Sequence, residues 1–275
     1  MAAPHPCAGV AAVRKDVRMT SIPAPPSPEL AAATEALRAQ WATLRPWIGA
    51  QVDARTGAEP SILEGWTVAH LVAHVGRALN ALTALEPAPE GTVPLALGEY
   101  VAGYADGAEA IAQGTRDLAE TLSPDLLAGV DALAAEAFDH LRTLGTVDRV
   151  VIARRGPIRL GDMVTSRVIE LVVHADDLQR SVDRARTSPS GAELLERGAP
   201  GPGPIHAGAL ELVSQALLDV LVARGGWSVE VVDPITWVRL AAGRTHYDVD
   251  TLAAALQAPY TSDAVPDLGR VLPLF

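Results

Sequence analysis

Residues 161–182 read GDMVTSRVIELVVHADDLQRSV, and this segment constrains the fold more than any other. Apolar side chains recur along it every three or four residues, which is the spacing of one face of an α-helix. That face consists of Val164, Val168, Leu171, Ala175, Leu178 and Val182. Ile169, Val172 and Val173 cover much of the remaining circumference, and a helix that is apolar nearly all round is a buried helix. The segment therefore predicts a buried helix.

Four polar side chains form a second stripe beside the apolar one. They are Arg167, Glu170, His174 and Asp177. Their offsets of 0, 3, 7 and 10 residues place them on one side of the helix. Burying a carboxylate among valines is unfavourable unless something compensates its charge. A divalent cation would do so, and imidazole with carboxylate is a ligand set for Zn²⁺ or Fe²⁺.

Two ligands rarely suffice for a metal ion, so a third has to come from another segment. A predicted helix earlier in the chain carries His70 and His74, with His74 at the edge of its apolar face. A second interpretation stays open, because Glu170 could pair with Arg167 or another arginine, and His174 could be a core histidine bonded to a carbonyl. The spacing of residues along the chain also does not show that His74 and Glu170 are close in space.

The composition bounds the class of protein. The chain has 275 residues, of which 49% are hydrophobic and only 4% aromatic, and this favours closely packed helices over a β-sandwich. The net charge of −11 without a basic cluster argues against nucleic-acid and anionic-membrane partners. The single cysteine, Cys7, cannot form an internal disulfide, and neither a membrane span nor a signal-peptide pattern is visible. We therefore expect a soluble, cytoplasmic, mainly helical protein.

Apolar periodicity and end signals predict the other elements. Helices are expected at about 28–48, 67–85, 95–121, 124–144 and 205–224. Ser27 as N-cap, followed by Pro28, marks the start of the first. Residues 147–160 predict a short hairpin or an irregular loop, residues 227–232 a strand, and residues 233–240 a short helix.

Three segments carry a resemblance to a known family. They are GWTVAHLVAH (residues 65–74), RVIELVVHADDL (residues 167–178) and DPITWVRLAAGR (residues 233–244). The first two resemble the motifs of mycothiol-dependent maleylpyruvate isomerases and their DinB-like relatives. The third resembles a signature of the sterol-carrier-like domain that is fused to many of these bundles.

The resemblance implies a mainly α fold, with a DinB-like four-helix bundle and a small α/β C-terminal domain. It implies that His74, Glu170 and His174 bind the metal, with zinc the expected ion, and that Asp177 orients a ligand. Recurring prolines without apolar periodicity predict a disordered tail over 1–27, and glycines between prolines predict a linker over 186–204. The resemblance then assigns the bundle to 28–185 and a shortened sterol-carrier-like domain to 205–275. His70 stands where the family usually has Asp, so it could alter the surroundings of the ligands or replace His74.

The implied function is that of a metal-dependent enzyme that uses an exogenous thiol, mycothiol, for isomerisation or S-transfer on a small electrophilic substrate. The chain supplies no nucleophile, since its cysteine lies in the predicted tail. Arg77, Arg239 and Arg244 could bind a substrate carboxylate, or they could be solvated arginines at helix ends. For Arg167 we expect an ion pair with a carboxylate of the bundle.

The alternative function is a non-enzymatic metal-containing module that binds a small apolar ligand or a partner protein. In that case His70 could close the metal site as a fourth ligand. For the enzyme, the expected partners are a small-molecule substrate and a low-molecular-weight thiol, with no nucleic acid and no membrane. A monomer and a homodimer are both compatible with the sequence.

Overall fold

The computed structural model describes residues 25–187, 202–260 and 265–275. Most of the predicted tail, including Cys7, and most of the predicted linker lie outside the described residues. In the part that is described, no helix is both long and apolar enough to cross a membrane.

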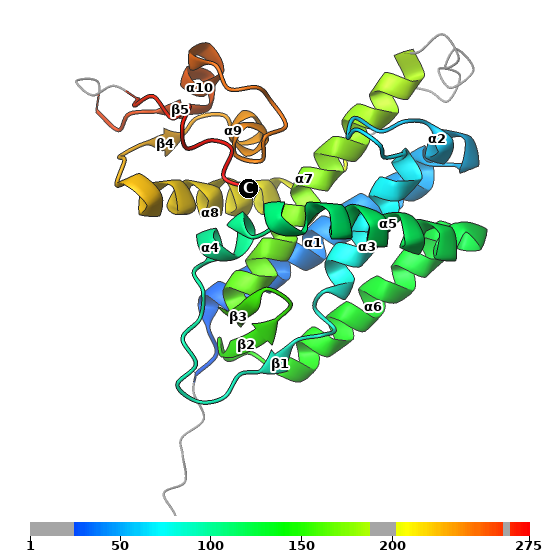
Figure 1. Cartoon of the computed structure of the whole chain (residues 1–275), viewed down its shortest axis with the longest axis horizontal. Coiled ribbons are helices and arrows are strands. Elements are labelled where there is room, and N and C mark those ends of the chain that lie inside the picture. The colour runs from blue at the N-terminus through cyan, green and yellow to red at the C-terminus, as the bar shows by residue number, and fades with distance from the viewer. Residues whose placement is uncertain (1–24, 188–201, 261–264) are drawn as a thin grey trace, which may run out of the picture.

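Four long helices form the bundle (Figure 1). They are α1 (Pro28–Gln51), α3 (Val68–Asn80), α6 (Leu126–Leu144) and α7 (Leu160–Thr187). Helix α7 packs along α1 and α3, and α3 packs along α6. A further helix, α5 (Ala108–Leu122), packs mainly on α3. The fold is mainly α, as the composition predicts.

Helix α7 is the buried helix that residues 161–182 predict. The side chains of Val164, Val168 and Leu171 are inaccessible to solvent, as are most of the other apolar residues of the helix. Because α7 touches both α1 and α3, almost its whole circumference is covered. A polar side chain on this helix is therefore buried unless it faces a cavity.

Local capping explains where the helices begin. Ser27 accepts a hydrogen bond from the backbone N–H of Leu30 at the start of α1, with Pro28 in the first turn, as predicted. At the start of α3 the hydroxyl of Thr67 accepts from the backbone N–H of His70. This cap fixes the first turn of the helix that carries His74.

Three element predictions are corrected. The helix expected over 67–85 ends at Asn80, and turns follow it. The helix expected over 95–121 is split into α4 (Leu97–Ala102), a 3₁₀ turn (Ala105–Gly107) and α5, with glycines at the breaks, where they weaken a helix. The loop expected after α1 contains a short helix, α2 (Ala54–Ala58), whose N-cap is Asp53.

The predicted hairpin is present before α7. Strands β2 (Val150–Ala153) and β3 (Gly156–Arg159) pair antiparallel, and β1 (Glu86–Pro87) adds to β2. Gly156 has a φ of 126°, which favours glycine in the tight turn. The hairpin leads directly into α7, so the arginines of its turn lie near the start of that helix.

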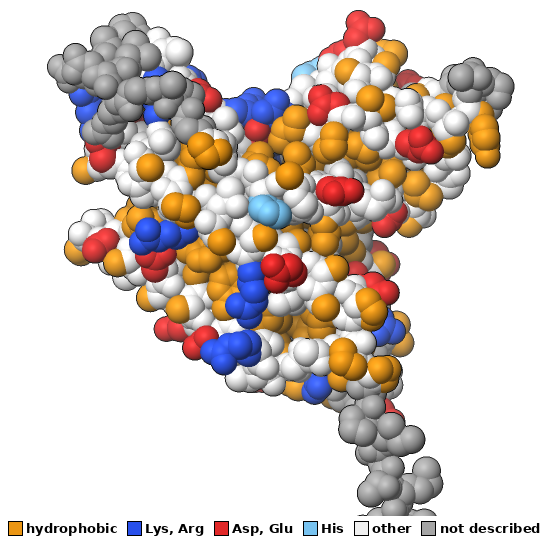
Figure 2. All heavy atoms as spheres, turned by 180° about the vertical axis from the view of Figure 1, so that it is seen from behind, with side chains coloured by type: hydrophobic (Ala, Val, Ile, Leu, Met, Phe, Trp, Pro, Cys, Tyr) orange, Lys and Arg blue, Asp and Glu red, His pale blue; other side chains and the backbone are white. Residues whose placement is uncertain are grey.

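The C-terminal part is a small α/β arrangement that packs on the bundle through its first helix (Figure 1). It contains α8 (Ala207–Gly225), β4 (Glu230–Val231), α9 (Pro234–Ala241), α10 (Val249–Ala255) and β5 (Leu256–Gln257). The buried Trp237 of α9 donates a hydrogen bond from Nε1 to the backbone oxygen of Ser214 on α8. On the face shown in Figure 2, acidic and basic side chains are interspersed with apolar ones.

Candidate metal centre

Two helices bring the three predicted ligands together. Nε2 of His74 on α3 lies 3.3 Å from Oε2 of Glu170 on α7, and Nε2 of His174 lies 3.4 Å from the same oxygen. One potential ligand atom from each residue lies within 4.8 Å of the other two. Helical periodicity places Glu170 beside His174, whereas the packing of α3 on α7 adds His74.

The outer nitrogen of each imidazole has its own partner. Nδ1 of His174 lies 2.9 Å from Oδ2 of Asp177, and Nδ1 of His74 lies 3.1 Å from Oγ1 of Thr115 on α5. Each ring therefore directs Nε2 towards Glu170, and the two rings meet edge to face with centroids 4.5 Å apart. Residues at these positions fix the tautomer and the orientation of metal-binding histidines in proteins.

Sequence reasoning did not find Thr115, which lies 41 residues from the histidine that it contacts. It is fully buried on a helix whose exposed face is strongly polar. A polar residue at a buried position of an amphipathic helix is the only signal in the sequence. Trp66 was also missed as a site residue, and its ring packs edge-on against His74 with centroids 5.1 Å apart.

Burial and neighbouring groups shift the pKa values of the three residues in different directions. For Glu170, burial alone would raise the pKa, but hydrogen bonds from His174 and His74 and the charge of Arg167 outweigh it and hold the pKa well below its usual range. Burial lowers the pKa of His74 to about 4. For His174, burial is outweighed by Asp177 and Glu170, which raise the pKa.

The residues fit a divalent metal ion. Without a metal, the carboxyl of Glu170 has a lowered pKa and faces His74, whose pKa is about 4, and His174, whose pKa is raised. One carboxylate oxygen and two imidazole nitrogens are the ligand set of many catalytic zinc sites. Three protein ligands would leave coordination positions for a small molecule, as a catalytic site requires.

The surroundings of two neighbouring residues differ from what the sequence suggested. His70 does not replace His74 in the cluster, and its Nδ1 accepts a hydrogen bond from the backbone N–H of Thr67 at the start of α3. Arg167 has no ion pair with a carboxylate in the described part of the chain. Its guanidinium donates instead to the hydroxyl of Tyr104 at 2.5 Å and to the backbone oxygen of Ala78 at 3.3 Å.

The three arginines expected near a substrate have different surroundings. Arg239 donates two hydrogen bonds to Asp176, at 2.6 and 2.9 Å, and Arg244 donates to Asp177 at 3.1 Å. Both are therefore paired with carboxylates of α7 while remaining partly exposed. Of the two, Arg244 lines a cavity at the cluster, whereas Arg239 lines neither of the cavities there. Arg77 lines a cavity next to the cluster.

Two cavities meet at the cluster, since His74 and Glu170 line both of them. The first has a volume of about 450 Å³, and its lining includes Trp66, His174, Arg244 and Phe275. The second has a volume of about 500 Å³ and is rich in arginine. The cluster is thus accessible from two sides, and each side offers a different chemical environment.

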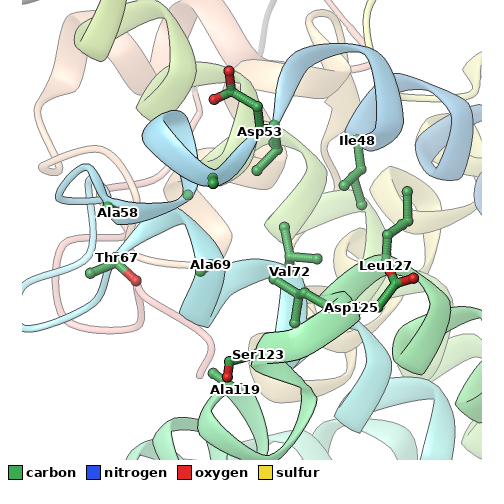
Figure 3. Close-up of a pocket in the computed structure, with 14 residues that line it drawn as sticks. Ile48, Asp53, Ala58, Thr67, Ala69, Val72, Ala119, Ser123, Asp125 and Leu127 are labelled. Carbon is green, nitrogen blue, oxygen red and sulfur yellow. The ribbon is translucent and has the colours of Figure 1, made fainter.

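A third cavity, shown in Figure 3, is unrelated to the cluster. It measures about 490 Å³ and is lined mainly by small and apolar side chains of α1, α2, α3 and α6. Its two carboxylates cap helices, since Asp53 accepts from the N–H of Thr56 and Asp125 from that of Ala128. None of the residues proposed from the sequence for metal or substrate lines it.

A family model and a solved structure that are similar to this chain both belong to mycothiol-dependent maleylpyruvate isomerases. The family model described as the mycothiol maleylpyruvate isomerase N-terminal domain matches residues 30–179. The fold is similar to a crystal structure of the mycothiol-dependent maleylpyruvate isomerase, with a TM-score of 0.51 and 19% identity over 86% of this chain and 95% of that chain. A histidine-to-alanine mutant of that isomerase gives a TM-score of 0.49 at the same identity and coverage. No curated protein matches the chain.

Proposed function

The chain belongs to the mycothiol maleylpyruvate isomerase family, and on this premise we propose that it is a metal-dependent enzyme that uses an exogenous thiol. The thiol would be mycothiol, and the reaction an isomerisation or an S-transfer on a small electrophilic substrate. The observation that carries the proposal is the convergence of His74, Glu170 and His174 at the meeting point of two cavities.

We assign the metal to these three residues and expect zinc. Their support comes from Asp177 and Thr115, which engage the outer nitrogens of the two histidines. A divalent ion held there would act as a Lewis acid that lowers the pKa of a thiol. Near neutral pH the low pKa values of Glu170 and His74 favour the forms that bind a metal, whereas the raised pKa of His174 makes protons compete with the metal at that residue.

The chain's own residues would bind and shield the reactants. Trp66 and Phe275 line the first cavity and limit the access of water to the cluster. Arg244 lines the same cavity while its Nε remains bonded to Asp177, so it can bind a reactant only by sharing its guanidinium. The thiol is expected to come from a second molecule, mycothiol, because the family model that matches the chain is that of a mycothiol maleylpyruvate isomerase.

The alternative of a closed structural metal site finds no support. It depended on His70 as a fourth ligand, and that side chain caps α3 instead. We also propose that residues 28–185 form the bundle domain and residues 205–275 a shortened sterol-carrier-like domain. A reaction that needs a free thiol is suited to the cytoplasm, where thiols stay reduced.

Metal content tests the first half of the proposal. Protein purified without chelator or added metal should contain about one equivalent of zinc or another divalent ion by mass spectrometry. The variant Glu170→Ala should lose it, whereas Glu136→Ala, an exposed glutamate of α6, should keep it. Wild-type protein that stays metal-free after reconstitution would rule out the proposed enzyme.

Thiol binding tests the second half. Cobalt-substituted protein should develop a sulfur-to-metal absorption band when mycothiol is added, because three protein ligands leave a position open. The band should be absent with an analogue of mycothiol in which a hydroxyl group replaces the thiol, because that analogue has no sulfur to bind the metal. A cobalt spectrum that mycothiol does not change would contradict thiol chemistry at this site while leaving the metal site intact.

A further inference from the structure

The second cavity beside the cluster has an unusual concentration of positive charge. Its arginines come from three parts of the chain: α3, the turn of the hairpin, and α7. They are Arg77, Arg154, Arg155 and Arg167. The only carboxylate in the lining is Glu170, which the proposed function assigns to the metal. A metal ion at the cluster would therefore leave the cavity with four cations and no free counter-charge.

None of these four arginines has a carboxylate within ion-pair distance among the described residues. Arg239 and Arg244 show the opposite behaviour, since each is bonded to a buried aspartate. Structural arginines near the core usually have such a partner, because an unpaired charge is costly to bury. Unpaired arginines around a cavity are instead typical of a site that receives an anion.

Two of the four guanidinium groups are held in place by uncharged partners. Arg167 donates to Tyr104 and Ala78, while the guanidinium carbon of Arg155 lies 4.3 Å from the centre of the Tyr104 ring. Nε of Arg155 also donates to the backbone oxygen of Gly103 at 3.3 Å. These contacts fix the positions of the groups without neutralising them.

The other two arginines of the cavity are more accessible to solvent. Arg77 is half-buried on α3, and Arg154 is exposed at the turn of the hairpin. Burial lowers the pKa of Arg77, and the charges of Arg154 and Arg155 lower it further. Arg77, Arg154 and Arg155 line one cavity and repel one another as like charges, and a bound anion would relieve that repulsion.

We propose that the second cavity binds a small anion, through one or more carboxylates or a phosphate of the substrate, next to the cluster. That the anion is the substrate rests on the proposed function. That the cavity binds an anion does not depend on it. The first cavity is then left for the thiol. The two reactants would then reach His74 and Glu170 through different cavities.

Binding can be measured without turnover by calorimetric titration of metal-free and zinc-loaded protein, in the absence of thiol. The probes are succinate as a dicarboxylate, inorganic phosphate, and succinamide as the uncharged counterpart of succinate. We expect saturable binding of an anion and none of succinamide. If succinate binds more tightly than phosphate, the site prefers carboxylates, and the reverse order indicates a phosphate ester.

Variants locate the site. Arg77→Gln and Arg154→Gln should each weaken anion binding by about tenfold, as expected for the loss of one hydrogen bond to a charged group. The matched control is Arg159→Gln, an exposed arginine of the same hairpin that does not line the cavity. Equal weakening in the control, equal binding of succinamide, or no saturable anion binding would each overturn the proposal.

The outcome is separable from that of the proposed function. Protein that contains the metal but binds no anion would refute only the anion site. Anion binding by protein that never acquires a metal would refute only the enzyme, and the cavity would then remain as an anion site of a non-catalytic protein.

Discussion

Asp176 and Asp177 are neighbours in the sequence and are both buried, yet they serve different structures. Asp176 accepts hydrogen bonds from Arg239 of α9, whereas Asp177 accepts from Arg244 and lies against the outer nitrogen of His174. Successive residues of a helix point about 100° apart, which is why only Asp177 reaches the cluster, although both carboxylates bind an arginine of the C-terminal part. The pair therefore allows the two roles to be tested independently.

Asp177→Asn should weaken zinc binding by about 10- to 100-fold, because the amide holds His174 less firmly and no longer stabilises its charge. The measurement is competition with a chromophoric chelator. Asp176→Asn is the control, and its zinc affinity should stay close to that of the wild type. Equal losses in both variants would indicate a general effect of buried carboxylates on the fold.

Thr115→Val should also weaken zinc binding, since Nδ1 of His74 would lose its only hydrogen-bond partner at 3.1 Å. We expect a loss of about tenfold, at the lower end for outer partners of metal-binding histidines. Thr121→Val, on the exposed side of the same helix, is the control. Unchanged affinity in Thr115→Val would show that the orientation of His74 is fixed by packing alone.

Zinc binding should release protons, and the affinity should fall as the pH falls. The pKa of His174 is raised above 6.5, so at pH 6.5 more than half of the molecules carry a proton on this residue that a metal must displace. His74, with a pKa of about 4, and Glu170, with its lowered pKa, should release almost none. Calorimetry in two buffers of different ionisation enthalpy should therefore show a net release of protons at pH 6.5, of roughly half a proton or more per metal ion. Asp177→Asn should lower that number, because it removes the largest contribution that raises the pKa of His174.

The metal-free protein should lose stability as the pH falls from 6.5 to about 4. In this range the unfolded chain protonates His74 and the folded protein does not, so protons favour unfolding. A shift of this size corresponds to about 3 kcal/mol in the free energy of unfolding. Urea denaturation across this pH range should show the decline, and His74→Gln should flatten it. The control is His246→Gln, at an exposed position, which should leave the decline unchanged. A decline that persists in His74→Gln would show that His74 is not its source.

Arg239→Gln should lower the free energy of unfolding by about 1–3 kcal/mol, because it leaves the buried Asp176 with fewer partners. The effect tests how firmly α9 is attached to α7. Arg142→Gln removes an exposed ion pair with Asp139 and should change stability by less than about 0.5 kcal/mol. If the two variants were equally stable, the contact between Arg239 and Asp176 would not contribute to the fold.

Much of the fold could be predicted from local patterns. The apolar stripe of 161–182, the cap at Ser27 and the β-branched run at 150–152 each specify a structure within one segment. The split of the region 95–121 was not predicted, because its apolar spacing continues through Gly103 and Gly107. The helices are interrupted at these two glycines, which weaken a helix without disturbing the apolar spacing on either side of them.

The candidate site likewise has one part that the sequence determined and another that only the tertiary structure decided. The sequence determined that Glu170, His174 and Asp177 share one face of a buried helix, since a fixed rise and rotation per residue make that arrangement a local property. Only the tertiary structure decided that His74 and Thr115 complete the cluster, that His70 caps a helix, and that unpaired arginines surround one cavity. These relationships join residues far apart in the chain, and they depend on which helices pack together, which is set by the whole core and not by any one segment.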